Sequence, residues 1–112
     1  MHSEFRFTRH GCRPSYDVSV RLFAEAADAF SVAISPEIVL EQALLNAVAL
    51  GLRSAYSATP TATPLAVTVA GVTDHSGATG ELGFKICGEA AMYKLLGLPD
   101  KAPFPGYVLG EA

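Results

Sequence analysis

The sequence predicts a two-layer α+β domain in which four strands and two helices follow the order β-β-β-α-β-α. Apolar and polar residues alternate in the first third of the chain and again over 65–70, as in strands with one buried face. Two longer segments, 36–50 and 80–96, carry apolar residues at helical spacing. We therefore expect a four-stranded mixed sheet with both helices packed on one face.

The composition fits one domain spanning residues 1–112. Half of the residues are apolar and 17% are charged, which allows the chain to bury a core. No apolar run approaches the roughly 18 residues that a membrane span needs, and residues 1–13 lack the apolar stretch of a secretory signal. We expect a cytoplasmic protein with no membrane partner, in which Cys12 and Cys87 stay reduced.

The charge is unevenly distributed along the chain. The net charge of −3 argues against nucleic-acid binding by the whole surface. The first 21 residues nevertheless hold four arginines, whereas residues 22–52 hold acidic residues and no lysine or arginine. Any attraction for a polyanion should therefore come from the N-terminal part.

The first three strands follow closely upon one another. Alternation over 5–8 and 18–24 predicts a hairpin whose loop contains Gly11-Cys-Arg-Pro-Ser15. The alternation resumes over 30–34 after a connection, 26–29, that is short enough to join adjacent strands. We expect the third strand to lie beside the second.

The first helix is predicted from Ser35-Pro36-Glu37 to about Leu50. Serine caps free amides, proline loses nothing at the first helical position, and glutamate faces the positive end of the helix dipole. Gly51 is interpreted either as the C-terminal cap or as a pause before 52–56.

The second half of the chain supplies one strand and one helix. The strand over 65–70 should lie parallel to the third strand, since a helix links them. The second helix begins at Thr79 or Gly80 and ends near 96–99, with Leu82 among the residues expected to pack on the sheet. The segment 103–112, rich in proline and glycine, is predicted to be an irregular tail.

One segment of the sequence is similar to a known family. Asp74-His75-Ser-Gly-Ala-Thr-Gly-Glu-Leu-Gly-Phe-Lys85 resembles the loop and helix of domain IV of translation elongation factor G, which belongs to the ribosomal protein S5 domain 2-like fold. The shared pattern is a histidine, five loop residues, then Glu-Leu-small-Phe-Lys. Gly11-Cys-Arg13-Pro-Ser-Tyr16-Asp-Val18 resembles a glycine-rich loop of the same domain, although Cys12 and Pro14 replace glycines.

The resemblance implies a fold and a function. The fold has a left-handed crossover between its parallel strands. The family's two loops form the tip that enters the decoding site, so the resemblance implies a stand-alone module that contacts ribosomal or other structured RNA. The residues expected to contact RNA are Arg9, His10, Arg13, Tyr16 and His75, because arginine bridges phosphates, tyrosine stacks, and histidine donates to a 2′-hydroxyl.

Other interpretations of these residues stay open. His75 can be an ordinary solvated residue, and Arg13 and Tyr16 can stack on each other to close the hairpin. The chain can also be a protein-interaction or oligomerising domain that keeps the fold without binding RNA.

Catalysis, a metal site and a cofactor are not indicated. His10 and Cys12 have too few companions for a zinc site. Cys12 and His75 lack an orienting acid for nucleophilic catalysis. The sequence contains no Gly-x-x-x-x-Gly-Lys-Ser/Thr loop, so we expect no nucleotide cofactor and no GTPase activity of that kind.

Overall fold

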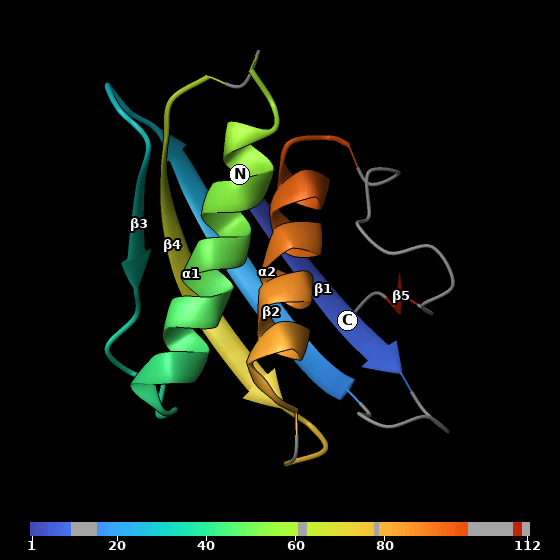
Figure 1. Cartoon of the computed structure of the whole chain (residues 1–112). Helices are drawn as coiled ribbons and strands as arrows, with labels where there is room; N and C mark the ends of the chain where they lie inside the picture. The colour runs from blue at the N-terminus through green and yellow to red at the C-terminus, as the bar shows by residue number, and fades with distance from the viewer. Residues whose placement is uncertain (10–15, 61–62, 78, 99–108, 111–112) are drawn as a thin grey trace.

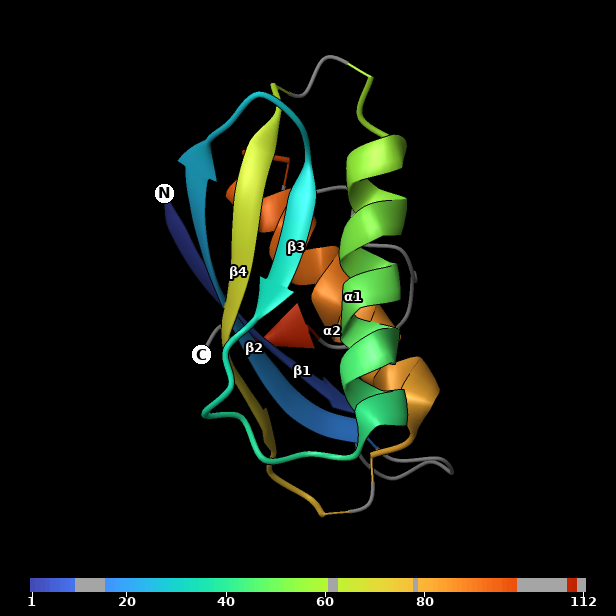
Figure 2. The ribbon, with the colours of Figure 1, turned by 90° about the vertical axis from the view of Figure 1, so that its left-hand side faces the viewer.

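The computed structural model describes residues 1–9, 16–60, 63–77, 79–98 and 109–110. They form one mixed sheet with two helices on one face, so the predicted α+β two-layer architecture is confirmed (Figures 1 and 2). The elements are, in chain order, β1 (His2–Arg9), β2 (Tyr16–Ala26), β3 (Ser31–Ile34), α1 (Gln42–Ser57), β4 (Leu65–Asp74), α2 (Glu81–Leu95) and β5 (Leu109–Gly110).

The strands lie in the order β3-β4-β2-β1-β5. β1 and β2 form the predicted antiparallel hairpin, with Phe5 opposite Val20 and Arg9 opposite Tyr16. The expectation that β3 lies beside β2 is wrong, because β4 lies between them, antiparallel to β2 and parallel to β3. β4 is therefore paired on both sides, and β3 forms one edge of the sheet.

The connection from β3 through α1 to β4 has the left-handed sense that the resemblance implies. In Figure 1 both helices lie in front of the sheet, and β3 and β4 both run down the page. The chain moves from β3 to β4 on its right, whereas a right-handed crossover in this view would move to the left. This uncommon connection confirms the expected topology.

The first helix begins and ends later than predicted. Ser35 remains in the sheet layer because its amide donates to the carbonyl of Val69 at 3.0 Å. The chain then makes only a turn, in which the amide of Ile38 donates to the Ser35 carbonyl at 3.2 Å. Residues 35–41 are needed to carry the chain from the sheet to the helix layer, so α1 starts at Gln42 rather than Pro36.

Glycines let the two helices approach at backbone distance. A Cβ atom on Gly88 of α2 would lie 2.6 Å from the carbonyl oxygen of Val48 in α1, and one on Gly51 would collide with the carbonyl oxygen of Lys85. Gly51 is therefore a contact residue inside α1 and not a helix cap. The helix continues past it because Leu52 and Ala55 are buried.

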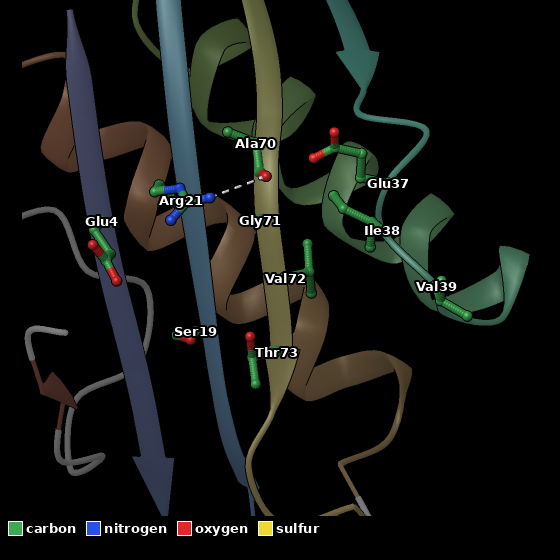
Figure 3. A pocket seen from close by; sticks show the side chains of 10 residues that line it. All are labelled: Glu4, Ser19, Arg21, Glu37, Ile38, Val39, Ala70, Gly71, Val72 and Thr73. Carbon is green, nitrogen blue, oxygen red and sulfur yellow. Dashed lines mark hydrogen bonds between the residues drawn. The ribbon is translucent and has the colours of Figure 1, made fainter.

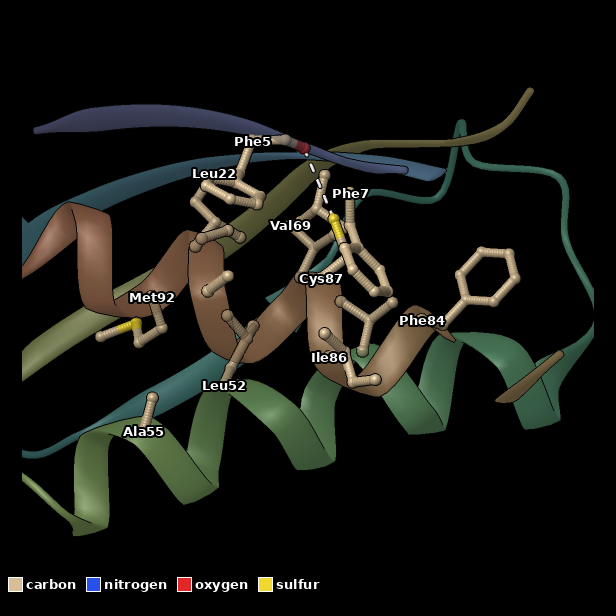
Figure 4. Packing of buried hydrophobic residues seen from close by; sticks show 14 of the residues in the cluster. Phe5, Phe7, Leu22, Leu52, Ala55, Val69, Phe84, Ile86, Cys87 and Met92 are labelled. Carbon is tan, nitrogen blue, oxygen red and sulfur yellow. Dashed lines mark hydrogen bonds between the residues drawn. The ribbon is translucent and has the colours of Figure 1, made fainter. Parts of the chain in front are cut away.

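The core lies between the sheet and the helices. Figure 4 shows residues of α2 packed between strand residues such as Phe5, Phe7 and Leu22 and α1 residues such as Leu52. Within the described residues, no helix is long and apolar enough to cross a membrane.

The predicted irregular tail, residues 103–112, is described only at Leu109–Gly110. These two residues pair antiparallel with Phe7 and Arg6 of β1, which makes β5 a fifth, very short edge strand. The rest of the tail lies outside the described residues.

Candidate functional site

Both loops of the predicted site belong to one end of the sheet. β1 ends at Arg9, β2 begins at Tyr16, β4 ends at Asp74, and α2 begins at Glu81, all at the lower end of Figure 1. We call this end the tip and define it as Arg9, Tyr16–Asp17 and Asp74–Gly80. Residues 10–15, including His10 and Arg13, connect two strand ends of the tip and lie outside the described residues.

The loop that carries His75 is built around the carboxylate of Asp74. One oxygen, Oδ1, accepts hydrogen bonds from the amides of Ser76 and Gly77 and from the Ser76 hydroxyl, at 3.0–3.2 Å. The other, Oδ2, accepts from the amide of Thr79 at 3.1 Å. An aspartate that satisfies the next backbone amides is a common way to fix a turn. Gly77 supplies the positive φ of 71° that the turn requires.

The Asp74 loop is also fastened to the start of β2. The amide of His75 donates to the carbonyl of Asp17 at 2.7 Å, and the amide of Asp17 donates to Oγ1 of Thr79 at 3.1 Å. Thr79 itself is buried. The backbone of His75 is therefore held in a defined position.

The His75 side chain is exposed, and its partner Ser19 lies between the buried residues Val18 and Val20, on the face of β2 opposite the core. Its Nε2 atom is 2.9 Å from Oγ of Ser19 on β2, and either atom can donate, according to the tautomer. The imidazole is thus presented at the surface by a fixed backbone and one side-chain contact.

Tyr16 cannot act as the predicted stacking residue, because its side chain is 2% exposed. Its ring packs against Phe7, with the ring centroids 5.6 Å apart. A Cβ atom on Gly83 of α2 would lie 2.6 Å from Cδ1 of Tyr16. The small residue of the Glu-Leu-small-Phe-Lys pattern therefore makes room for a core tyrosine.

An ion pair beside the tip was not predicted from the sequence. Nε and Nη2 of Arg6 donate to the two carboxylate oxygens of Asp17 at 2.8 and 2.9 Å. The hydrogen bond to Asp17 raises the pKa of Arg6 above its already high usual value. Asp17 lies diagonally across from Arg6 in the hairpin. The opposite charges of these two residues, on one face of a predicted hairpin, were the signal in the sequence that could have indicated the ion pair.

This ion pair changes the electrostatics of the site. Arg6 is neutralised locally by Asp17, Asp74 adds a negative charge to the described part of the tip, and Glu81 adds another at the adjoining start of α2. The positive charges that the sequence assigns to this end are those of Arg9 and Arg13, with His10 between them in the chain. Arg9 ends β1 opposite Tyr16, as expected of a tip residue; its side chain lies outside the described residues.

Cys87 belongs to the core. Its side chain is fully buried, and its thiol lies 3.5 Å from the carbonyl of Phe5 and 3.4 Å from that of Val18 (Figure 4). Burial raises the pKa of Cys87 to about 12, although the amides of Phe7 and Val20 oppose the shift. A thiol with so little thiolate at neutral pH is unsuited to nucleophilic chemistry.

A shallow groove of about 360 Å³ lies on the open sheet face next to the tip (Figure 3). Arg21 crosses it, with a guanidinium nitrogen 3.4 Å from the carbonyl of Ala70, over the backbone of Gly71. Glu4 and Glu37 also line the groove. Two carboxylates beside one guanidinium do not favour a polyanion, so this groove does not extend a phosphate-binding surface from the tip.

The described residues contain no group of three or more histidine, cysteine or acidic side chains placed to hold a metal ion. Cys12, which the sequence analysis considers together with His75, lies outside the described residues.

This geometry defines the chain as a two-layer α+β domain with a left-handed β3–α1–β4 connection and a loop-built tip. The crystal structure of ttk003000868 from Thermus thermophilus is similar to it, with a TM-score of 0.67 over 83% of this chain. The two sequences are 18% identical over that match, which covers 15% of the Thermus chain, so the likeness shows the fold alone. No family model and no curated protein matches the sequence.

Proposed function

We propose that this chain is a translation-factor-like module that binds structured RNA, such as ribosomal RNA, through its tip. The observation that carries the proposal is the Asp74 loop, whose carboxylate and whose bonds to Asp17 hold His75 at a fixed surface position. The same loop holds the sequence pattern that resembles domain IV of elongation factor G. The fold, with its left-handed connection, supports the comparison.

The chemistry expected at the tip divides between two kinds of contact. Arg9 and Arg13 supply positive charge for phosphates, and His10 can add a hydrogen bond to them; contacts of this kind dominate affinity without reading sequence. His75 supplies a directional hydrogen bond to a backbone oxygen or to a 2′-hydroxyl. The 2′-hydroxyl is the group that distinguishes RNA from DNA. Tyr16 has no part in this proposal, because its ring is buried.

The experiment is a binding titration against ribosomal particles and against an isolated structured RNA. The test variant is the double substitution Arg13→Ala/His75→Ala. Its matched control is Arg53→Ala, which removes one positive charge from the exposed side of α1, away from the tip. We expect the double variant to bind at least tenfold more weakly, and Arg53→Ala to bind like the wild type.

Two results would overturn the proposal. One is the absence of any salt-sensitive binding by the wild-type protein. The other is equal weakening by Arg53→Ala and by the double variant, which would mean that net charge and not the tip governs binding.

A further inference from the structure

A second groove lies between the two helices, on the side of the helix layer that faces away from the sheet. It has a volume of about 470 Å³ and is lined by α1 and α2. Its residues are Ala43, Asn46, Ala47, Leu50, Glu81, Leu82 and Lys85. The lining is largely apolar, with the charged residues all on α2.

Two leucines in this groove are half exposed. Leu50 of α1 is 53% exposed and Leu82 of α2 is 50% exposed. The expectation that Leu82 packs on the sheet is wrong, because Gly83 and Phe84 of the same helical turn occupy that position. Neighbouring exposed leucines on two helices form an apolar patch of the kind found at protein interfaces.

The charges beside the patch form a self-complementary pattern. Glu81 and Lys85 lie one helical turn apart on α2. In the part of the chain that the structure describes, Glu81 forms no ion pair, whereas Lys85 lies within electrostatic range of Glu89, one turn further along α2. Two such helices placed antiparallel bring each glutamate opposite the lysine of the other copy.

We propose that this groove binds a second copy of the same chain through a two-fold axis. Helix α2 packs antiparallel to α2 of the second copy, Leu50 and Leu82 fill the centre, and Glu81 and Lys85 form reciprocal ion pairs at the rim. A two-fold interface requires this reciprocity, since each contact occurs twice.

The dimer contact lies beside the proposed RNA-binding tips. Because α2 begins at the tip and the ion pairs join Glu81 to Lys85, antiparallel packing brings the first turns of the two helices together while the two tips point in opposite directions. Two leucines and one pair of charges from each copy make a small contact, so association should be weak and concentration-dependent.

The test is sedimentation equilibrium over a wide range of protein concentration. We expect the mean mass of the wild-type protein to rise from the monomer value of 11.7 kDa toward the dimer value. Glu81→Lys and Lys85→Glu should each weaken association at least tenfold, because each places like charges opposite one another. The double swap Glu81→Lys/Lys85→Glu should restore it, which a folding defect could not do.

Leu82→Ser should weaken association as well, whereas Phe23→Ser should not. Phe23 is the matched control because it is 45% exposed on the open sheet face, away from the groove. A protein that stays monomeric at all concentrations would overturn the proposal. Failure of the double swap to restore association, or loss of association in Phe23→Ser, would also overturn it. RNA binding by a monomer would leave the proposed function standing.

Discussion

Replacing Gly88 with alanine should destabilise the protein even though alanine is the better helix former. The added Cβ atom would lie 2.6 Å from the Val48 carbonyl oxygen and 3.2 Å from the Val48 Cα atom. Both are backbone atoms, so α1 must move as a unit. Overpacking of this kind costs about 2–3 kcal/mol, and the gain in helix propensity offsets about 1 kcal/mol. The expected net loss is therefore about 1–2 kcal/mol.

The assay is urea unfolding followed by circular dichroism. A lower midpoint with an unchanged slope would report lost stability of the native state. Gly80→Ala is the control, because a Cβ atom there meets nothing within 4 Å and the backbone is extended. Because alanine is a poorer N-cap residue than glycine, we expect Gly80→Ala to lose about 0.5 kcal/mol or slightly more, and less than Gly88→Ala. If Gly88→Ala were no less stable than the wild type, the close packing of the helices would be refuted.

Three further predictions concern single side chains. In a Cys12→Ser protein, Cys87 should not react with a thiol reagent at pH 8 until the chain is unfolded, because burial raises its pKa to about 12; rapid native reaction would contradict this. Burial raises the pKa of Glu89, so the folded protein loses stability at a pH high enough to ionise this carboxyl group. Glu89→Gln should therefore raise the urea midpoint at pH 7 but not at pH 3, and an equal gain at both would be inconsistent. Asp74→Ala should cost about 1 kcal/mol or more and speed hydrogen exchange at the amides of Ser76, Gly77 and Thr79, whereas the exposed Asp28→Ala should do neither.

The sequence was informative where local patterns decide the structure. Apolar residues recur at every second position of β1 and β2 because only one face of each strand is buried, and both predicted strands are present. The second helix also ends as predicted, because Gly97 adopts a φ of 77° and closes the last turn.

Other features depended on contacts between distant segments. The start of α1 was misplaced because the bond from Ser35 to Val69, some thirty residues away, keeps the chain in the sheet. The sequence left Gly51 open as a cap or as a pause in the helix, because its contact with Lys85 of the other helix leaves no local signal.

The candidate site shows the same division. The Asp74 turn has a local cause, and the pattern around His75 pointed to it. Tyr16 was assigned to the surface because alternation alone does not reveal that Phe7 and Gly83 enclose its ring. The partnership of Arg6 with Asp17 required the strand register, which the sequence left undefined.

The most direct test of the tip as an RNA-binding surface is the salt dependence of binding to ribosomal particles. Each phosphate contact contributes roughly 0.7–0.9 to the slope of log affinity against log salt. We predict that Arg13→Ala lowers this slope by about one contact, while Arg53→Ala leaves it unchanged. Equal slopes for the wild type and Arg13→Ala would contradict the central claim.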